Sequence, residues 1–164
     1  MDSAVSLTFR NIAAADIELA ASVFVACFSA PPWNEPWTLA AAIRRLGLFA
    51  SAPTFRGVLA IEGGDVVAMA TGQVEGWWRG SLFLIQEMCV VPRRQDAGIG
   101  TQLLQHLLSE LQKNDDVSQA YLLTDAGSDA ESFYVARGFR RSERKIVLSL
   151  AGGGTAPLTT RRGA

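Results

Sequence analysis

The chain has 164 residues, of which 49% are hydrophobic and 19% charged, and its formal net charge is −1 at pH 7. This length predicts one domain that can bury a core without disulfide or metal support. The balanced charge argues against a general nucleic-acid binder, because binding through counterion release needs a surplus of Lys and Arg on one face. The apolar content argues against a disordered chain.

Only two cysteines occur, Cys27 and Cys89, and each lies in an apolar stretch. This is not a disulfide framework and favours a reducing compartment. The chain does not open with the pattern of a signal peptide, and no apolar run reaches the ~18 residues of a membrane helix. We therefore expect a cytoplasmic protein with no membrane partner.

The first part of the chain predicts a strand and two helices. Residues Val5–Arg10 alternate apolar and polar side chains, as a strand does, whereas Ala14–Phe28 repeats apolar residues at three- and four-residue steps, as a helix does. Pro31-Pro32 should end this helix. A loop follows over Pro32–Trp37, and a second helix is expected over Thr38–Phe49.

Three strands are predicted in the middle of the chain. Val58–Ile61 and Val66–Gln73 flank Glu62–Asp65, which has the composition of a hairpin turn. Trp77–Gly80 makes a second turn. Ser81–Val91 then forms a long, mostly apolar strand, which we expect to be central in the sheet.

The last part predicts a helix over Ile99–Lys113, a strand over Val117–Thr124, a short helix over Asp129–Arg137 capped by Gly138, and a strand over Arg144–Leu150. The long helix carries one apolar stripe, formed by Leu103, Leu104, Leu107, Leu108 and Leu111. The order of elements predicts a single α/β domain over residues 1–150, with a disordered tail over 151–164.

A glycine-containing loop joins the long strand to the long helix. Glycines let a backbone approach a ligand closely, and the N-terminus of a helix offers unpaired N–H groups and a positive dipole end. The loop therefore predicts a phosphate site. A dinucleotide fingerprint fails because Leu103 replaces its third glycine, and a nucleotide-hydrolase loop fails because there is no lysine.

The loop carries Gln95-x-x-Gly98-x-Gly100, and Phe133-Tyr134-Val135-Ala136-Arg137-Gly138-Phe139 follows one strand and one helix later. Together these motifs resemble the Gln/Arg-x-x-Gly-x-Gly/Ala and Phe/Leu-Tyr-x-x-x-Gly-Phe signatures of the GCN5-related N-acetyltransferase (GNAT) family. The resemblance extends in element order from Leu7 to Leu150. It implies a mixed, mostly antiparallel central sheet flanked by helices, with a splayed strand pair for the cofactor.

The resemblance also implies acetyl-CoA as co-substrate. The pyrophosphate would be held by the loop, and the pantetheine arm by main-chain groups of the long strand. The implied cofactor residues are Gln95, Asp96, Ala97, Gly98, Ile99, Gly100 and Thr101 for the loop, and Met88, Cys89 and Val90 for the strand. A backbone N–H of the strand could also stabilise the oxyanion.

For the chemistry, the resemblance implies that Tyr134 protonates the departing thiolate. An ammonium must lose a proton before it attacks, and a carboxylate is the expected base. Glu87 is the first choice, Glu75 the second and Asp125 the third. Packing alone would also account for Tyr134, and Glu87 could instead be an exposed strand carboxylate.

The loop departs from the family pattern at Asp96 and Ala97, where glycine and basic residues are common. Asp96 should repel phosphate if it points inward, although Arg93 or Arg94 could offset it. Gly127 stands where relatives often carry an asparagine, which puts one secondary cofactor contact in doubt, with Ser128 nearby.

Four tryptophans lie in or beside loops that the family fold places at the acceptor side, and three glutamates are expected nearby. The tryptophans are Trp33, Trp37, Trp77 and Trp78, and the glutamates are Glu35, Glu75 and Glu87. Such residues suit a cationic amine through charge pairing and cation–π contact. The tryptophans could equally plug the edges of the core.

Other chemistries find less support. Nothing near Cys89 in the sequence would lower its pKa, so a packed thiol is favoured over a nucleophile. His106, the only histidine, lies on the polar face of its helix, where we expect it to be solvated. One histidine supplies neither a good triad nor a zinc site.

The sequence therefore predicts an N-acetyltransferase that acetylates a small cationic amine, such as an aminoglycoside-like or polyamine compound. The amine would attack the thioester directly in a ternary complex, without a metal. Two alternatives stay open: a protein or peptide N-acetyltransferase and a non-catalytic acyl-CoA binding module. Homodimers are common in the family, and no feature of the sequence decides the oligomeric state.

Overall fold

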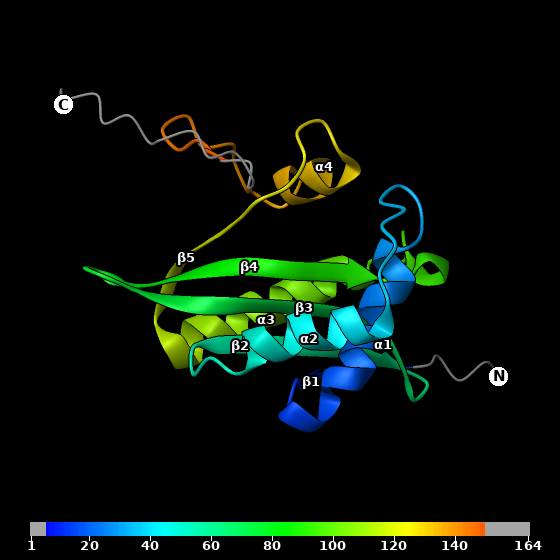
Figure 1. Ribbon diagram of the computed structural model, residues 1–164. Helices are drawn as coiled ribbons and strands as arrows, with labels where there is room; N and C mark the ends of the chain where they lie inside the picture. Colours follow the sequence, from blue (N-terminus) through cyan, green and yellow to red (C-terminus); the bar gives the residue numbers. More distant parts are fainter. Residues whose placement is uncertain (1–5, 150–164) are drawn as a thin grey trace, which may run out of the picture. The chain divides into compact units, whose positions relative to one another are not determined.

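The computed structural model describes residues 6–149 (Figure 1). The chain divides into two compact units, one ending at Thr124 and the other beginning at Asp125. We call them the sheet unit and the C-terminal unit. In the described part of the sheet unit, the strands are β1 (Leu7–Asn11), β2 (Phe55–Glu62), β3 (Asp65–Trp77), β4 (Gly80–Val90) and β5 (Val117–Leu122), and the α-helices are α1 (Ile17–Phe28), α2 (Leu39–Ala50) and α3 (Ile99–Asp115). The C-terminal unit contains α4 (Asp129–Val135).

The five strands form one sheet in the order β1-β2-β3-β4-β5. The first three pairings are antiparallel, and β4 pairs with β5 in parallel. The two hairpins, β2–β3 and β3–β4, turn where the sequence predicted them. The prediction of a mixed, mostly antiparallel sheet is therefore confirmed.

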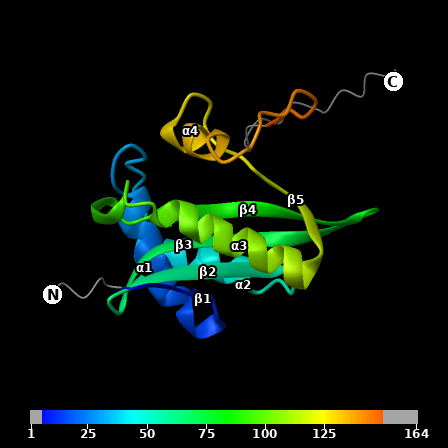
Figure 2. The same cartoon turned by 180° about the vertical axis from the view of Figure 1, so that it is seen from behind.

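Helices cover both faces of the sheet. In Figure 1, α1 and α2 lie in front of the strands, and in Figure 2 α3 lies on the opposite face. The predicted stripe of α3 is buried at Leu103, Leu104, Leu107 and Leu111, while Leu108 is half-buried. The core therefore has two layers, one on each face of strands β2 to β4, whose interior residues are almost fully buried.

Local chemistry explains how two of the helices begin. The Thr38 hydroxyl accepts a hydrogen bond from the Ala41 N–H, so Thr38 is the N-cap of α2. Helix α1 is preceded by a 3-10 turn over Ala14–Asp16, in which Asp16 accepts hydrogen bonds from the Ala13 N–H and from Arg10. The predicted helix over Ala14–Phe28 is thus a short turn followed by a regular helix.

Strand β4 is paired differently along its two halves. Its first half, Ser81–Ile85, pairs with β5, but its second half has only β3 as a strand partner among the described residues. Gln86 is an extra residue in the register with β3, because Thr71 lies opposite Glu87 and Gly72 lies opposite Ile85. The predicted splayed pair is therefore present, and it opens at a β-bulge.

The C-terminal unit is organised around the short helix α4. The Ser128 hydroxyl accepts a hydrogen bond from the Glu131 N–H, and Gly138 has a left-handed φ of 90°, as expected for a helix terminator. The helix ends at Val135, two residues earlier than predicted. The N–H groups of Arg137 and Gly138 donate to carbonyls three residues back, so the last turn is tighter than an α-helix.

The prediction of a last strand over Arg144–Leu150 is wrong for residues 144–149, which have no regular secondary structure. Leu150 and the tail over 151–164 lie outside the described residues. Three consecutive apolar residues at 146–148, two of them β-branched, suggested a strand. A strand also needs a neighbouring edge that completes its ladder of hydrogen bonds, and side-chain composition does not supply one.

Among residues 6–149, no helix is long and apolar enough to cross a membrane.

Candidate functional site

The loop between β4 and α3 bends through two left-handed residues. After a 3-10 turn over Pro92–Arg94, Asp96 has a φ of 60° and Gly98 a φ of 77°. Gly98 is the N-cap of α3, and no side chain caps the helix there. The sequence therefore places its glycine where left-handed backbone is required, and an aspartate at a second such position, which Asp tolerates better than most residues.

This backbone leaves a run of N–H groups without partners. Within the described part of the chain, no hydrogen bond is donated by the N–H groups of residues 96–100. They surround the N-terminus of a 17-residue helix, where the helix dipole is positive. Thr101 follows as the third residue of α3. The loop therefore has the backbone features of a phosphate site.

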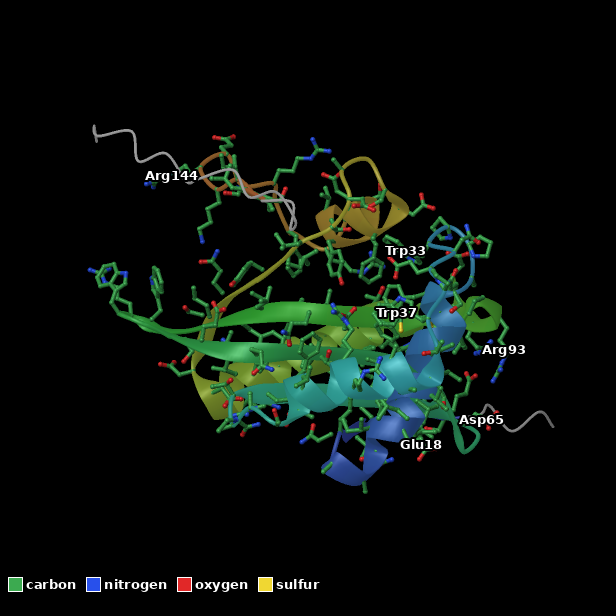
Figure 3. The ribbon with its side chains drawn as sticks, viewed as in Figure 1. Glu18, Trp33, Trp37, Asp65, Arg93 and Arg144 are labelled. Atoms are coloured by element: carbon green, nitrogen blue, oxygen red, sulfur yellow. The ribbon has the colours of Figure 1, made fainter. Side chains whose placement is uncertain are left out.

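The side chains around the loop anchor it to the sheet. The Gln95 amide donates a hydrogen bond of 3.1 Å to the carbonyl of Val90, the last residue of β4. Arg94 forms an ion pair of 2.5 Å with Glu62, and Arg93 lies 3.7 Å from Asp65 (Figure 3). Both arginines thus contact carboxylates at the β2–β3 hairpin, so their charge is partly neutralised and is not reserved for Asp96.

The other implied cofactor element is the second half of β4. Met88, Cys89 and Val90 lie beyond the last residue of β4 that pairs with β5. Their main chain is paired with β3 on one side. On the other side no described strand pairs with them, so an extended ligand could hydrogen-bond there as an added strand.

Glu87 is buried on the face of β4 that α1 and α2 cover. Its side chain is only 8% exposed, and its Oε1 atom accepts a hydrogen bond from Arg45 Nε at 2.7 Å and forms an ion pair with Nη2, which lies 2.5 Å away. Arg45 belongs to α2, so Glu87 faces the α1 and α2 side of the sheet. The alternative that Glu87 is an exposed strand carboxylate is therefore wrong.

Burial and neighbouring charges shift the pKa of Glu87 in opposite directions. Burial raises the pKa of the Glu87 carboxyl above its usual value, the Arg45 guanidinium lowers it, and the carboxylate of Glu35 raises it. The net direction is upward. A carboxyl that titrates at higher pH is a stronger base when ionised, which suits proton transfer from an ammonium group.

Residues of the α1–α2 loop and of α2 surround the Arg45 side chain. The guanidinium lies over the rings of Trp37 and Phe49, at 5.8 and 4.9 Å from their centroids. The Trp37 indole N–H donates to Glu35 at 2.5 Å. A continuous path of contacts therefore runs from Glu35 through Trp37 and Arg45 to Glu87.

The tryptophans divide into two groups. Trp37 contacts Phe24 and Trp33 contacts Phe28, both in the C-terminal part of α1. Figure 3 shows the two tryptophans near this end of the helix. Trp77 and Trp78, by contrast, are exposed at the β3–β4 turn, where Arg79 lies over the Trp78 ring at 4.3 Å. Trp37 is linked to Glu87 through Arg45, and Trp33 is linked to Trp37 through Phe28 and Phe24. The predicted acceptor tryptophans therefore form one group on the Glu87 side and a separate, exposed pair at the β3–β4 turn.

Glu75 has its own partner. Both of its oxygens accept from the Tyr121 hydroxyl, at 3.0 and 2.9 Å. Burial and this carboxylate raise the pKa of Tyr121. Both carboxylate oxygens of Glu75 therefore already accept from a hydroxyl on β5, whereas Oε2 of Glu87 accepts no hydrogen bond from a described residue.

The two cysteines lie close together. Cys89 makes a side-chain hydrogen bond with Cys27, which belongs to α1, and this bond together with burial raises the pKa of Cys89 well above its usual value. Both thiols are free. This state favours the interpretation of Cys89 as a packed thiol over a nucleophile.

Tyr134 lies within α4 and is buried among the aromatic side chains of the C-terminal unit. Its ring contacts Phe133 and Phe139, with centroids 5.1 and 5.2 Å apart. In the same unit, the Ser128 hydroxyl donates to the Asp125 carbonyl and accepts from the Glu131 N–H. Ser128 is therefore engaged in capping α4 and is poorly suited to replace the missing asparagine.

His106 differs from its prediction. It is half-buried, and its ring stacks on Phe9 of β1 with centroids 4.7 Å apart. It therefore packs α3 against the edge strand of the sheet and is not a solvated surface residue.

Sequence reasoning missed Arg45, Tyr121 and Thr71. Thr71 is opposite Glu87 on β3 and is almost fully buried, and its hydroxyl has no hydrogen-bond partner among the described residues. For Arg45 a signal existed: it follows the buried Ala42 by three residues and precedes the buried Leu46, so it borders the buried stripe of α2. An arginine in that position can reach the sheet, where a carboxylate is the expected partner.

Comparisons with known proteins show the family of the chain. A family model described as an acetyltransferase (GNAT) domain matches residues 53–141, more than half of the chain. The chain belongs to the GNAT acetyltransferase domain family. A search of curated protein sequences found no match.

Solved structures share the fold at low identity. An aminoglycoside N-acetyltransferase, AAC(6')-Iy, in complex with CoA has a TM-score of 0.72 at 14% identity, covering 92% of this chain and 98% of that one. An aminoglycoside acetyltransferase from an uncultured soil metagenomic sample, in complex with sisomicin, has a TM-score of 0.68 at 16% identity, covering 90% and 97%. A transcriptional regulator from Bacillus halodurans has a TM-score of 0.71 at 16% identity, covering 88% and 100%. The protein is thus similar in fold to acetyltransferases and to a regulator, and fold alone does not fix its activity.

Proposed function

We propose that this protein transfers the acetyl group of acetyl-CoA to a primary amine, most readily a small cationic amine, by direct attack in a ternary complex. The observation that carries this proposal is the run of N–H groups over residues 96–100, at the N-terminus of α3, that have no partner among residues 6–149. A backbone cradle of this kind fits the pyrophosphate of a coenzyme A thioester. Membership of the GNAT family supports acetyl transfer.

Two elements of the sheet unit would hold acetyl-CoA. Residues Gln95 to Thr101 would bind the pyrophosphate, with Gln95 anchoring the loop to the end of β4. Met88, Cys89 and Val90 would hydrogen-bond the pantetheine arm at the edge of β4 that lacks a second strand. Acetyl-CoA supplies an activated acyl group with a thiolate as its leaving group.

Glu87 would act as the general base. Arg45 contacts only Oε1, and no described residue donates a hydrogen bond to Oε2. The second oxygen is therefore available to take a proton from the acceptor ammonium, directly or through one water. The freed amine attacks the thioester carbonyl, while Tyr134 donates a proton to the departing sulfur.

The acceptor follows from the charges around Glu87. Glu35 adds negative charge beside Glu87, and Trp37 adds an aromatic face, so a cation is the favoured ligand. Two of the solved structures with this fold are aminoglycoside acetyltransferases, which supports a small polycationic acceptor.

Calorimetric titration with acetyl-CoA and then with CoA tests the proposal. We expect micromolar binding, followed by thiol release when amines such as aminoglycosides and polyamines are added. Binding without turnover on any amine or peptide would favour a non-catalytic acyl-CoA module. Turnover on peptides alone would favour a protein acetyltransferase, and absence of binding would contradict the proposal.

A further inference from the structure

The ion pair between Glu87 and Arg45 is asymmetric. Both guanidinium nitrogens contact Oε1, at 2.7 and 2.5 Å, and Oε2 receives no hydrogen bond from the described residues. The carboxylate is 8% exposed, whereas the Arg45 side chain is 42% exposed. Glu87 is therefore fixed between the sheet and the helices, and Arg45 reaches it from the exposed side of α2.

The aromatic rings beside Arg45 restrict where its guanidinium can lie. It lies over Phe49 of the same helix and over Trp37 of the preceding loop. Trp37 is itself held by the hydrogen bond from its indole N–H to Glu35. A guanidinium held on two rings loses little further freedom when it binds a carboxylate, so the pair is preorganised.

The groups that face Glu87 would favour its protonated form if Arg45 were absent. From the loop, Glu35 contributes a second negative charge, and from β4 itself Cys89 contributes a neutral thiol that is hydrogen-bonded to Cys27 of α1. From β3, Thr71 lies directly opposite with a buried hydroxyl. Arg45 is the positively charged group in this set, so the charge of Glu87 depends on it.

We propose that Arg45 is the positioning residue for Glu87: it holds the carboxylate ionised and fixes Oε1, so that Oε2 is presented to the acceptor amine. This inference rests on the proposed function, in which Glu87 is the base. It differs from a blocking role, in which the acceptor ammonium would have to displace Arg45 before Glu87 could accept a proton.

The first experiment is the pH dependence of kcat/KM for Arg45→Met, Arg45→Lys and the wild type. Removing a positive charge in contact with a carboxylate raises its pKa by about 1 to 3 units, and the partial exposure of Arg45 favours the lower end. We expect the acidic limb to move up by about one pH unit in Arg45→Met. Arg45→Lys should keep the limb near that of the wild type.

Arg44→Met is the matched control. Arg44 precedes Arg45 on α2, is exposed and forms no ion pair with a described residue, so its loss should leave the limb in place. An unmoved limb in Arg45→Met would overturn the proposal. Faster turnover in that variant at neutral pH would also overturn it, because it would indicate a blocking role.

A second experiment does not depend on turnover. The side-chain carboxyl carbon of Glu87, assigned by its loss in Glu87→Gln, is titrated by NMR in the wild type and in Arg45→Met. We expect a higher midpoint in the variant, and equal midpoints would overturn the inference. If the midpoint moves but no amine is acetylated by the wild type, the role of Arg45 toward Glu87 stands and the proposed function fails.

Discussion

The Tyr121 hydroxyl on β5 donates to the carboxylate of Glu75 on β3, at 3.0 Å from one oxygen and 2.9 Å from the other. The strand between them is β4, so this contact crosses the strand that carries Glu87. Glu75 and Glu87 are therefore held by different partners, a neutral hydroxyl and a guanidinium. We infer different roles for them: Glu75 as a fixed negative charge and Glu87 as the base.

Replacing each carboxylate by its amide separates these roles. Glu87→Gln removes the proton acceptor, so kcat should fall by about 10²- to 10⁴-fold. Glu75→Gln removes a charge that attracts the substrate, so KM for a cationic amine should rise while kcat changes little. Steady-state kinetics with saturating acetyl-CoA measures both effects.

Acetyl-CoA affinity serves as the control for both variants, because neither carboxylate belongs to the loop before α3. A larger loss of kcat in Glu75→Gln than in Glu87→Gln would reverse the assignment. Equal small effects in both would indicate that neither is the base and would direct attention to Asp125.

Tyr134→Phe tests the general acid. The aromatic contacts with Phe133 and Phe139 do not need the hydroxyl, so the C-terminal unit should keep its fold. We expect kcat to fall by about 10²-fold or more, with acetyl-CoA affinity nearly unchanged. The chain has one other tyrosine, Tyr121, whose hydroxyl holds Glu75. Tyr121→Phe is therefore the matched control for kcat, which it should leave unchanged, and KM for the amine is not compared in it. A wild-type kcat in Tyr134→Phe would show that this residue only packs.

Asp96→Asn tests the charge in the phosphate loop. Asp96 has a φ of 60°, a conformation that Asn also tolerates, so this substitution removes the charge without adding backbone strain. Two solvent-exposed charges interact by about 0.2 to 1 kcal/mol, so removing the repulsion between Asp96 and the pyrophosphate should tighten acetyl-CoA binding by roughly 1.4- to fivefold. Calorimetry measures the change.

Gly98→Ala gives the opposite expectation at the same loop. A Cβ on Gly98 would meet no atom within 4 Å, but its φ of 77° costs a residue with a side chain about 1 to 2 kcal/mol. Weaker acetyl-CoA binding is expected as the N–H groups reorient.

The Asp96→Asn prediction has a contradicting outcome. If this variant bound acetyl-CoA more weakly than the wild type, Asp96 would help to order the loop for the ligand and would not repel it.

Gly72 is expected to be essential for the pairing of β3 with β4. A Cβ at this position would lie 2.1 Å from the Leu84 carbonyl oxygen and 2.5 Å from the Phe83 ring. Because one neighbour is backbone, the strands must shift, and Gly72→Ala should destabilise the protein by about 3 kcal/mol or more. Gly76→Ala, on the same strand with no atom within 4 Å, should be nearly neutral. Urea unfolding compares the two, and equal midpoints would contradict the expectation.

Much of the sheet unit could be predicted from the sequence because its signals are local. The leucine stripe of α3 follows helical periodicity, and the loop at Gly98 combines a strand end, a required glycine and a helix start within a few residues. Such features need no knowledge of the rest of the chain. The backbone geometry of the loop before α3 could therefore be predicted from the sequence.

The contacts of Glu87 and Glu75 could not be predicted in the same way, because they are long-range. Arg45 and Glu87 are 42 residues apart, and Glu75 and Tyr121 are 46 apart. Both pairs depend on strand register and on which helix face meets the sheet, and the bulge at Gln86 shifts that register by one residue. A one-residue shift moves side chains to the other face of a sheet, so periodicity alone could not pair these residues.

The ion pair between Glu131 and Arg141 makes the C-terminal unit sensitive to acid. The hydrogen bond from Arg141 and that from the Gly127 N–H lower the pKa of Glu131 from 4.5 to about 2. Because the folded-state pKa is the lower one, the stabilisation is fully present above pH 4.5 and is lost as the pH falls toward about 2. Arg141→Gln should raise the pKa of Glu131 toward its ordinary value, with the Gly127 contact keeping it below. Arg140→Gln, a neighbouring arginine without an ion pair to a described residue, should leave it unchanged. NMR titration of the Glu131 carboxyl measures each midpoint, and an unmoved midpoint in Arg141→Gln would mean that the ion pair does not persist in solution.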